Sequence, residues 1–172
     1  MRKKVLFQKY ALYFFILLFL YVIQTTPGLL ALGPNKPLLI LGAVVCIAIK
    51  EKELVGGIYG AVGGMFCDLS AFTYYGFYSI SFLLCGAAVG LMITFLVRDK
   101  LSNAVILVLC SMTMIKLWEY FFSYGIWGYD PGGRIFWTRI LPTVVYSTLW
   151  TPLWYWLFGR LSEYFARRLE VL

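Results

Sequence analysis

The sequence predicts an all-helical integral membrane protein, a bundle of six transmembrane helices. Of its 172 residues, 62% are hydrophobic and only 13% are charged, and the mean hydropathy is +0.82. A soluble domain cannot bury so much apolar surface, and several apolar runs are long enough to cross a bilayer. Because the length suits one compact domain, we expect residues 1–172 to form a single transmembrane domain.

Six apolar segments are separated by turn residues and charged residues. The first follows a basic flank ending at Lys9 and has no small-residue cleavage site, so it predicts a retained span and not a signal peptide. The second is short, about 20 Å of a roughly 30 Å core. It therefore spans with help from residues 29–32, thins the membrane locally, or is partly re-entrant. The predicted spans are 10–25, 37–49, 54–69, 77–97, 101–124 and 135–158.

The basic residues predict the orientation. With six spans and an inside N-terminus, eleven Lys and Arg residues fall in inner segments, three fall outside, and Lys116 lies within a span. Inner loops of membrane proteins are enriched in Lys and Arg, so both termini are expected to be cytoplasmic. The net charge of +7 follows from this asymmetry and does not indicate nucleic-acid binding. The tail from Gly159 predicts a short amphipathic helix on the inner surface.

The third predicted span is rich in glycine. Gly56, Gly60 and Gly64 recur every four residues with Gly63 beside them, and Asp68 follows at the same interval. Such glycines form a flank that another helix can approach backbone to backbone, and a small-residue patch in the fourth span predicts that these two spans pack closely. Two interpretations stay open. The span is either a tightly packed helix ending in a capping acid, or a helix that binds a partner or lines a pocket.

Four charged residues are predicted to lie at similar depth near the outer face. Asp68 ends the third span, Lys116 and Glu119 lie three apart in the fifth, and Arg139 lies near the start of the sixth. Their charges cancel, and buried charges are costly unless they are paired. We therefore predict a polar cluster of these four residues. The alternative is that each side chain reaches the membrane interface separately.

Patterns typical of catalysis or cofactor binding are missing from the sequence. The chain has no histidine, which excludes histidine-dependent acid–base chemistry, Ser–His nucleophiles and histidine metal ligands. The four cysteines lie inside apolar runs without metal-type spacing. The glycine-rich span lacks the Gly-Lys-Ser/Thr end of a phosphate-binding loop. We expect a protein that is not an enzyme and has no cofactor, metal or nucleic-acid partner.

Several features spread along the chain match one known pattern. They are a short segment led by Pro37, a charged turn, a glycine-rich span ending in Asp68, and a short loop to Gly76 and the next span. In this combination the chain resembles the rod shape-determining protein MreD family. The first and last thirds match only in hydropathy, and residues 70–73 stand where the family pattern has a more glycine-rich loop.

The resemblance implies a non-enzymatic scaffold of the cell-wall elongation machinery in the bacterial inner (cytoplasmic) membrane. Such a scaffold maintains rod shape by binding an MreC-like bitopic protein and, through it, MreB and the complex of RodA with a penicillin-binding-protein synthase. The family is also similar in fold to the S components of energy-coupling-factor transporters, so the alternative function is binding a vitamin for transport. S components typically carry an Ala-x-x-x-Ala pattern in the first span. Here Ala11 stands alone, which favours the scaffold.

Overall fold

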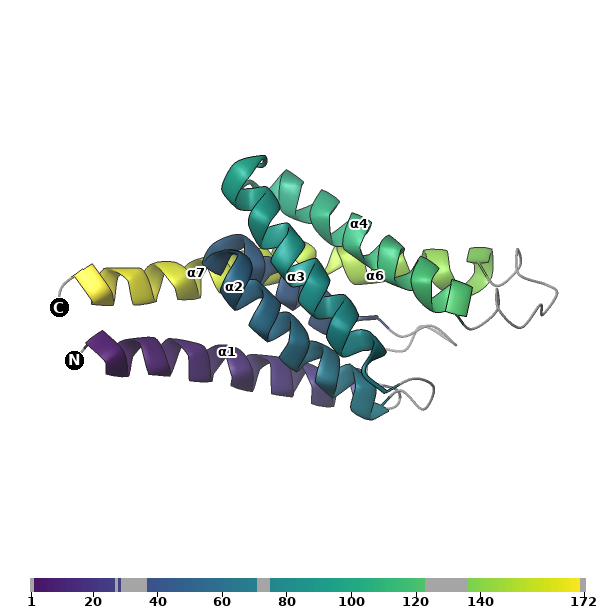
Figure 1. Ribbon diagram of the computed structural model, residues 1–172, viewed down its shortest axis with the longest axis horizontal. Helices are drawn as coiled ribbons and strands as arrows, with labels where there is room; N and C mark the ends of the chain where they lie inside the picture. The colour runs from purple at the N-terminus through teal and green to yellow at the C-terminus, as the bar shows by residue number, and fades with distance from the viewer. Residues whose placement is uncertain (1, 27, 29–36, 71–74, 123–135, 171–172) are drawn as a thin grey trace.

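The computed structural model describes residues 2–26, 28, 37–70, 75–122 and 136–170, and these ranges are helical apart from short turns and connections. Figure 1 shows a bundle in which long helices cross one another, with α1 and α7 side by side. The elements are α1 (Arg2–Thr25), α2 (Leu39–Ser70), α3 (Phe77–Phe95), α4 (Leu101–Tyr120), the π-helix η2 (Phe136–Ile140), α6 (Leu141–Leu149) and α7 (Thr151–Glu170).

The chain reverses direction in the middle of α2. Lys52 has a φ of 70° and a ψ of −170°, which no helical residue adopts and which is uncommon for a residue other than glycine. Gly63 consequently lies against Ile40 and Val44. In a straight helix, residues 40 and 63 would be about 35 Å apart. The predicted second and third segments are therefore the two halves of a helical hairpin.

The first half of α2 is the centre of the bundle. All residues from Leu39 to Ile49 are buried, and α1, α4, α6 and α7 contact α2. At its start, Ser147 Oγ accepts a hydrogen bond from the Leu38 N–H (2.9 Å) and Gln24 Oε1 accepts one from the Ile40 N–H (3.4 Å). Protein thus surrounds the segment that is too short to cross a bilayer core alone. Residues 29–32, which were expected to lengthen it, lie outside the described ranges.

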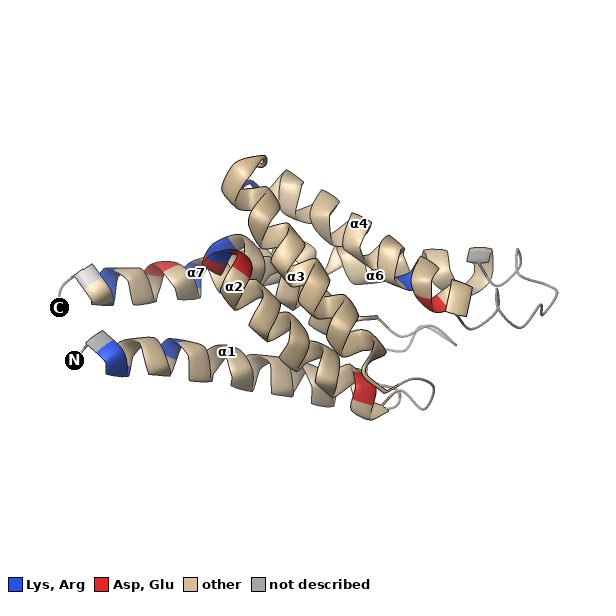
Figure 2. Cartoon of the chain, viewed as in Figure 1, with Lys and Arg blue, Asp and Glu red and all other residues tan. Residues whose placement is uncertain are grey.

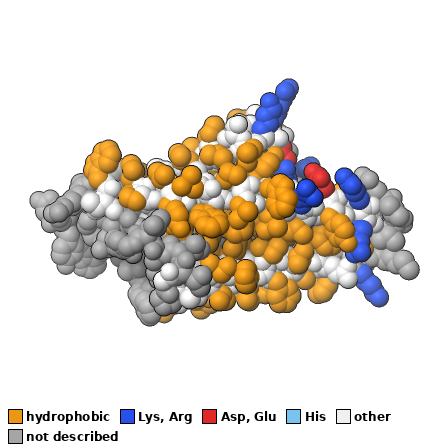
Figure 3. Space-filling view, turned by 180° about the vertical axis from the view of Figure 1, so that it is seen from behind, with side chains coloured by type: hydrophobic (Ala, Val, Ile, Leu, Met, Phe, Trp, Pro, Cys, Tyr) orange, Lys and Arg blue, Asp and Glu red, His pale blue; other side chains and the backbone are white. Residues whose placement is uncertain are grey.

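Three helices are long and apolar enough to cross a membrane: Lys3–Thr25, Phe77–Phe95 and Leu101–Tyr120. Hydrophobic side chains cover much of the face drawn in Figure 3, and Lys and Arg side chains gather toward one end of it. In Figure 2, charged residues of α1 and α7 lie toward the chain ends, and a charged turn marks the middle of α2. The described part is thus an all-helical membrane protein with an apolar exterior.

The predicted sixth span, residues 135–158, is interrupted by Pro142 and Pro152 in the sequence, and its described part is not one helix. From residue 136 this region is divided among η2, α6 and the first part of α7. Pro142 and Pro152 are each the second residue of a helix. Proline is tolerated there because the first helical N–H groups have no partner within the helix. The two prolines therefore mark the starts of α6 and α7.

The predicted separate amphipathic helix of the tail is continuous with α7. Phe158 and Phe165 are buried, and Leu161 packs against the core between them. Tyr164 is exposed on the opposite side. The amphipathic pattern is thus present, but its apolar face contacts the bundle and does not lie on a membrane surface.

Candidate functional site: the α2–α3 contact and the charged turn of α2

The contact between α2 and α3 is the most extensive in the molecule. Gly56, Gly60 and Gly64 face successive turns of α3. The α3 residues opposite these glycines are, in the same order, Gly86, Phe82 and Ser79. A methyl group added at any of the three would overlap backbone atoms of α3. The helices therefore approach to a distance that these positions allow only to glycine.

Gly63 belongs to a different contact from the other three glycines of the predicted flank. A Cβ atom there would meet Ile40 Cγ2 (2.8 Å) and Val44 Cγ2 (3.1 Å), in the first half of α2. Gly57, by contrast, has room: its nearest neighbour would be Ala87 Cβ at 3.6 Å, an ordinary contact. The second half of α2 thus presents glycine to α3 on one side and to its own first half on another.

Asp68 joins the end of α2 to the start of α3. Its carboxylate accepts hydrogen bonds from the Tyr78 N–H (3.0 Å), the Ser79 N–H (3.0 Å) and the Ser79 hydroxyl (2.5 Å). The residue is 5% exposed. The first N–H groups of a helix lack intrahelical partners, and a carboxylate satisfies them well. Asp68 therefore caps α3 from the neighbouring helix.

Lys116 and Glu119 form an ion pair within α4, with 2.7 Å between Nζ and Oε2. The side chain of Tyr78 lies close to the Glu119 carboxylate, while the Tyr78 backbone bonds to Asp68. No ion pair joins Asp68 to Lys116, both of which lie in described ranges. The Arg139 side chain lies outside the described residues. The described members of the predicted cluster thus form two separate units, the Asp68 cap and the Lys116–Glu119 pair, and Tyr78 lies between them.

A second polar group, which the sequence interpretation did not predict, surrounds Glu51 in the turn of α2. Lys9 Nζ lies 2.5 Å from Glu51 Oε1, and each of these side chains is 9% exposed. The same oxygen accepts hydrogen bonds from the Tyr13 hydroxyl (3.0 Å) and the Ser162 hydroxyl (3.1 Å). One buried carboxylate therefore ties α1 and α7 to the turn.

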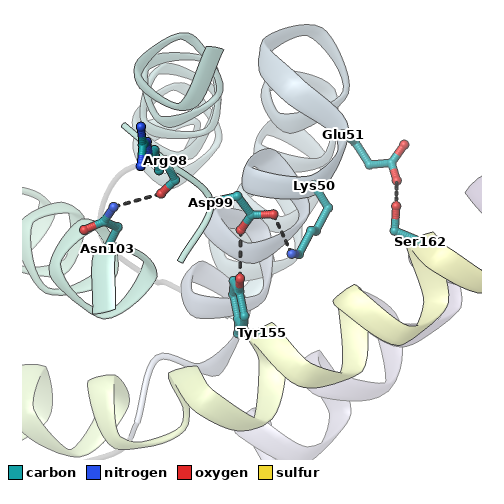
Figure 4. A network of polar contacts seen from close by, with 7 residues as sticks. All are labelled: Lys50, Glu51, Arg98, Asp99, Asn103, Tyr155 and Ser162. Atoms are coloured by element: carbon teal, nitrogen blue, oxygen red, sulfur yellow. Dashed lines mark hydrogen bonds and ion pairs between the residues drawn. The ribbon is translucent and has the colours of Figure 1, made fainter. Parts of the chain in front are cut away.

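Lys50, beside it, binds the connection between α3 and α4. Its Nζ lies 2.7 Å from Asp99 Oδ2 and 4.3 Å from the centre of the Tyr155 ring, and the Tyr155 hydroxyl donates to Asp99 Oδ1 (2.9 Å). Figure 4 shows Lys50 and Tyr155 converging on Asp99, with Glu51 directed toward Ser162 on α7. Burial lowers the pKa of Lys50, but the hydrogen bond and charge of Asp99 outweigh it and raise that pKa above its ordinary value. We call the two groups together the turn network: Lys9, Tyr13, Lys50, Glu51, Asp99, Tyr155 and Ser162.

Lys9, the last residue of the predicted basic flank, is 7% exposed and paired with Glu51. Two signals in the sequence indicate the network. Charges of alternating sign fill residues 50–53, and Lys9 and Tyr13 lie one helical turn apart. Neither signal predicts that Ser162 completes the site.

The described residues offer little for small-molecule chemistry. A cavity of about 180 Å³ opens between α3 and α4, and its lining is almost wholly apolar. The lining residues are Ser81, Leu84, Cys85, Ala88, Met114, Ile115 and Trp118. Within the described ranges, no three His, Cys, Asp or Glu side chains are grouped so that they could hold a metal ion. The polar side chains described above instead join helices to one another.

Comparison with protein families, curated proteins and solved structures finds no match to this chain.

Proposed function

We propose that this chain is a non-enzymatic membrane scaffold of the cell-wall elongation machinery, as the resemblance to the MreD family implies. The observation that carries the proposal is the Asp68 cap. The residue that makes the glycine-rich motif most specific is buried and fully engaged with Tyr78 and Ser79. Asp68 thereby ties α2 to α3, and its own carboxylate is occupied by these hydrogen bonds. A motif with this role suits a protein that presents a fixed surface to partners.

The proposed topology has six crossings with both termini cytoplasmic. The two halves of α2 are the second and third crossings, and η2, α6 and α7 together make the sixth. Two features support it: the reversal at Lys52 and the ends of α1 and α7 lying side by side in Figure 1. In this arrangement the turn network faces the cytoplasm and the Asp68 cap faces outward. The fold would be similar to that of the transporter S components.

The partners we propose are an MreC-like bitopic protein and, through it, the RodA–penicillin-binding-protein complex, in the bacterial inner membrane. The described surface carries many exposed apolar side chains. Such side chains can pack against another membrane helix as well as against lipid, so this surface suits membrane-spanning partners. The cavity between α3 and α4 favours the scaffold over the vitamin-binding alternative. Vitamin sites combine apolar walls with several placed polar groups, and this cavity has one hydroxyl, that of Ser81, in its lining.

Affinity purification of the tagged full-length chain from its native membranes tests the proposal. We expect an MreC-like bitopic protein and RodA to be recovered with it, and Asp68→Ala to reduce that recovery. Depletion of the protein should turn rod-shaped cells round. Recovery of ATPases and a tightly held vitamin would instead support the transporter alternative, and unchanged cell shape after depletion would contradict the scaffold.

A further inference from the structure

The exposed face of α7 carries aromatic and basic side chains in alternation. Trp156, Arg160, Tyr164 and Arg168 follow one another at intervals of four residues, so they form one stripe along the helix. The Arg160 guanidinium lies 5.0 Å from the centre of the Trp156 ring, and that of Arg168 lies 4.9 Å from the centre of the Tyr164 ring. Trp156 is 57% exposed and Tyr164 is 52% exposed. We call these four residues the α7 stripe.

The opposite face of α7 fixes the stripe in place. Trp154, Phe158 and Phe165 are buried in the bundle, and Ser162 donates a hydrogen bond to Glu51. The helix therefore cannot rotate to bury the exposed rings without losing these contacts. Neither stripe guanidinium forms an ion pair with an acidic residue in the described part of the chain. Both cations are held over rings, and neither donates a hydrogen bond to a side chain or carbonyl of the described residues.

The turn network gives the depth of the stripe. Ser162 lies at the level of the α2 turn. At 1.5 Å per residue, Arg160 and Tyr164 lie about 3 Å to either side of that level, and Arg168 lies about 9 Å beyond it. A headgroup layer is roughly 5–8 Å thick. Under the proposed topology, on which this step rests, the stripe crosses the headgroup layer of the inner leaflet.

We propose that the α7 stripe binds the phosphate groups of anionic phospholipids in the inner leaflet. Arginine donates to phosphate oxygens in a fork geometry, and half-exposed Trp and Tyr rings prefer the membrane interface. The described surroundings are mainly basic: Arg167 and, on α1, Lys3 and Lys4 are also exposed, against two exposed acids, Glu163 and Asp99, the second of which pairs with Lys50. The aromatic rings distinguish this surface from other exposed basic positions such as Arg98 and Lys100, which have no described cation–π partner.

Native mass spectrometry of the full-length protein in neutral detergent, titrated with phosphatidylglycerol or phosphatidylcholine, tests the proposal without depending on topology or on the cell-wall role. We expect the wild type to bind phosphatidylglycerol more tightly, and Arg160→Gln/Arg168→Gln to lower that affinity roughly tenfold or more while leaving phosphatidylcholine binding unchanged. The control Arg98→Gln/Lys100→Gln removes the same charge and should stay within about twofold of the wild type. Millimolar glycerol phosphate should not displace the lipid, because the aromatic rings contact the lipid molecule and gain nothing from a free phosphate group.

A variant that keeps both arginines separates the stripe from plain charge. Trp156→Leu/Tyr164→Leu should weaken phosphatidylglycerol binding about threefold, because the rings no longer hold the guanidinium groups in place. Equal binding of both lipids by the wild type, or equal losses in the two charge variants, would overturn the proposal. So would preferential binding of an acidic peptide. If the arginine variant does not fold, the salt dependence of the wild type tests the proposal: its affinity for phosphatidylglycerol must fall as the salt concentration rises.

Discussion

Two regions of α2 hold the bundle together by opposite means. Against α3, the second half of the helix has no side chains at the closest points, so the backbones themselves touch at Gly56, Gly60 and Gly64. At the turn, long polar side chains reach across to α1, α7 and the α3–α4 connection. The first contact excludes every larger residue, whereas the second depends on the identity of each pair of charges.

The two contacts are expected to tolerate amino-acid substitutions differently. Helices in lipid associate by close packing, so the glycine contact has no substitute of larger volume. A buried ion pair is stabilising only relative to the unpaired charge, so losing both partners costs less than losing one. We therefore expect single substitutions of the buried Lys9–Glu51 pair to be severe and paired ones mild, and substitutions of the glycines to be severe in proportion to size.

The largest expected effect comes from removing the charge of Glu51. Glu51→Gln leaves the Lys9 ammonium buried beside a neutral amide and should lower the free energy of unfolding by about 3 kcal/mol. Lys9→Met/Glu51→Gln should recover most of that loss, because no charge remains unpaired. Unfolding of the purified protein in mixed detergent and SDS measures both. A double variant as unstable as the single one would refute the pairing.

The glycine contact gives the next largest effect. Gly60→Ala places a methyl group against the backbone of Phe82 and should cost about 1–3 kcal/mol. Gly57→Ala, three residues earlier in the same helix, is the matched control, where the new methyl group meets Ala87 at an ordinary 3.6 Å. The control should be neutral or stabilising, since alanine favours the helix. The same SDS titration compares them, and equal stability of the two variants would show that α2 and α3 are not in backbone contact.

A smaller effect is expected at the Asp68 cap. Asp68→Ala leaves the N–H groups of Tyr78 and Ser79 without their acceptor and should cost about 1–2 kcal/mol. Ser79→Ala removes only the hydroxyl donor and should cost less. Amide exchange in the first turn of α3 should speed up in the Asp68 variant and not elsewhere in α3. Uniform acceleration along α3 would mean that Asp68 has a different role.

The smallest effect belongs to Lys50 and Asp99, because the Asp99 side chain is 40% exposed. Lys50→Met should cost at most about 1 kcal/mol. Since the pKa of Lys50 is raised in the folded state, its contribution is fully present below the ordinary value of 10.5 and is lost as pH rises above it. The stability difference between wild type and variant should therefore be constant from pH 6 to about pH 9 and shrink above about pH 10.5. A difference that changes near neutral pH would contradict the assigned pairing.

The sequence predicts those features that depend on local spacing. Glycines four residues apart indicate a helix contact wherever they occur, and Asp68 at the same interval lies at that contact's end. The charged residues 50–53 between two apolar segments predict the reversal in α2. The positive φ at Lys52 could not be predicted, because it follows from the packing on both sides and not from lysine itself. The partnership of Glu51 with Ser162 joins positions 111 residues apart, which no local pattern reveals. The buried pair of Lys9 with Glu51 likewise joins residues far apart in the sequence.

Site-directed labelling of single cysteines tests the account most directly, since a cytoplasmic turn network and an outward Asp68 cap require the second half of α2 to cross the membrane. In a background with the four native cysteines replaced by alanine, Lys52→Cys and Tyr75→Cys each provide one exposed thiol. A membrane-impermeant maleimide applied from outside should label position 75 and not position 52. In inverted vesicles the pattern should reverse. Labelling of both positions from the same side would contradict the hairpin crossing.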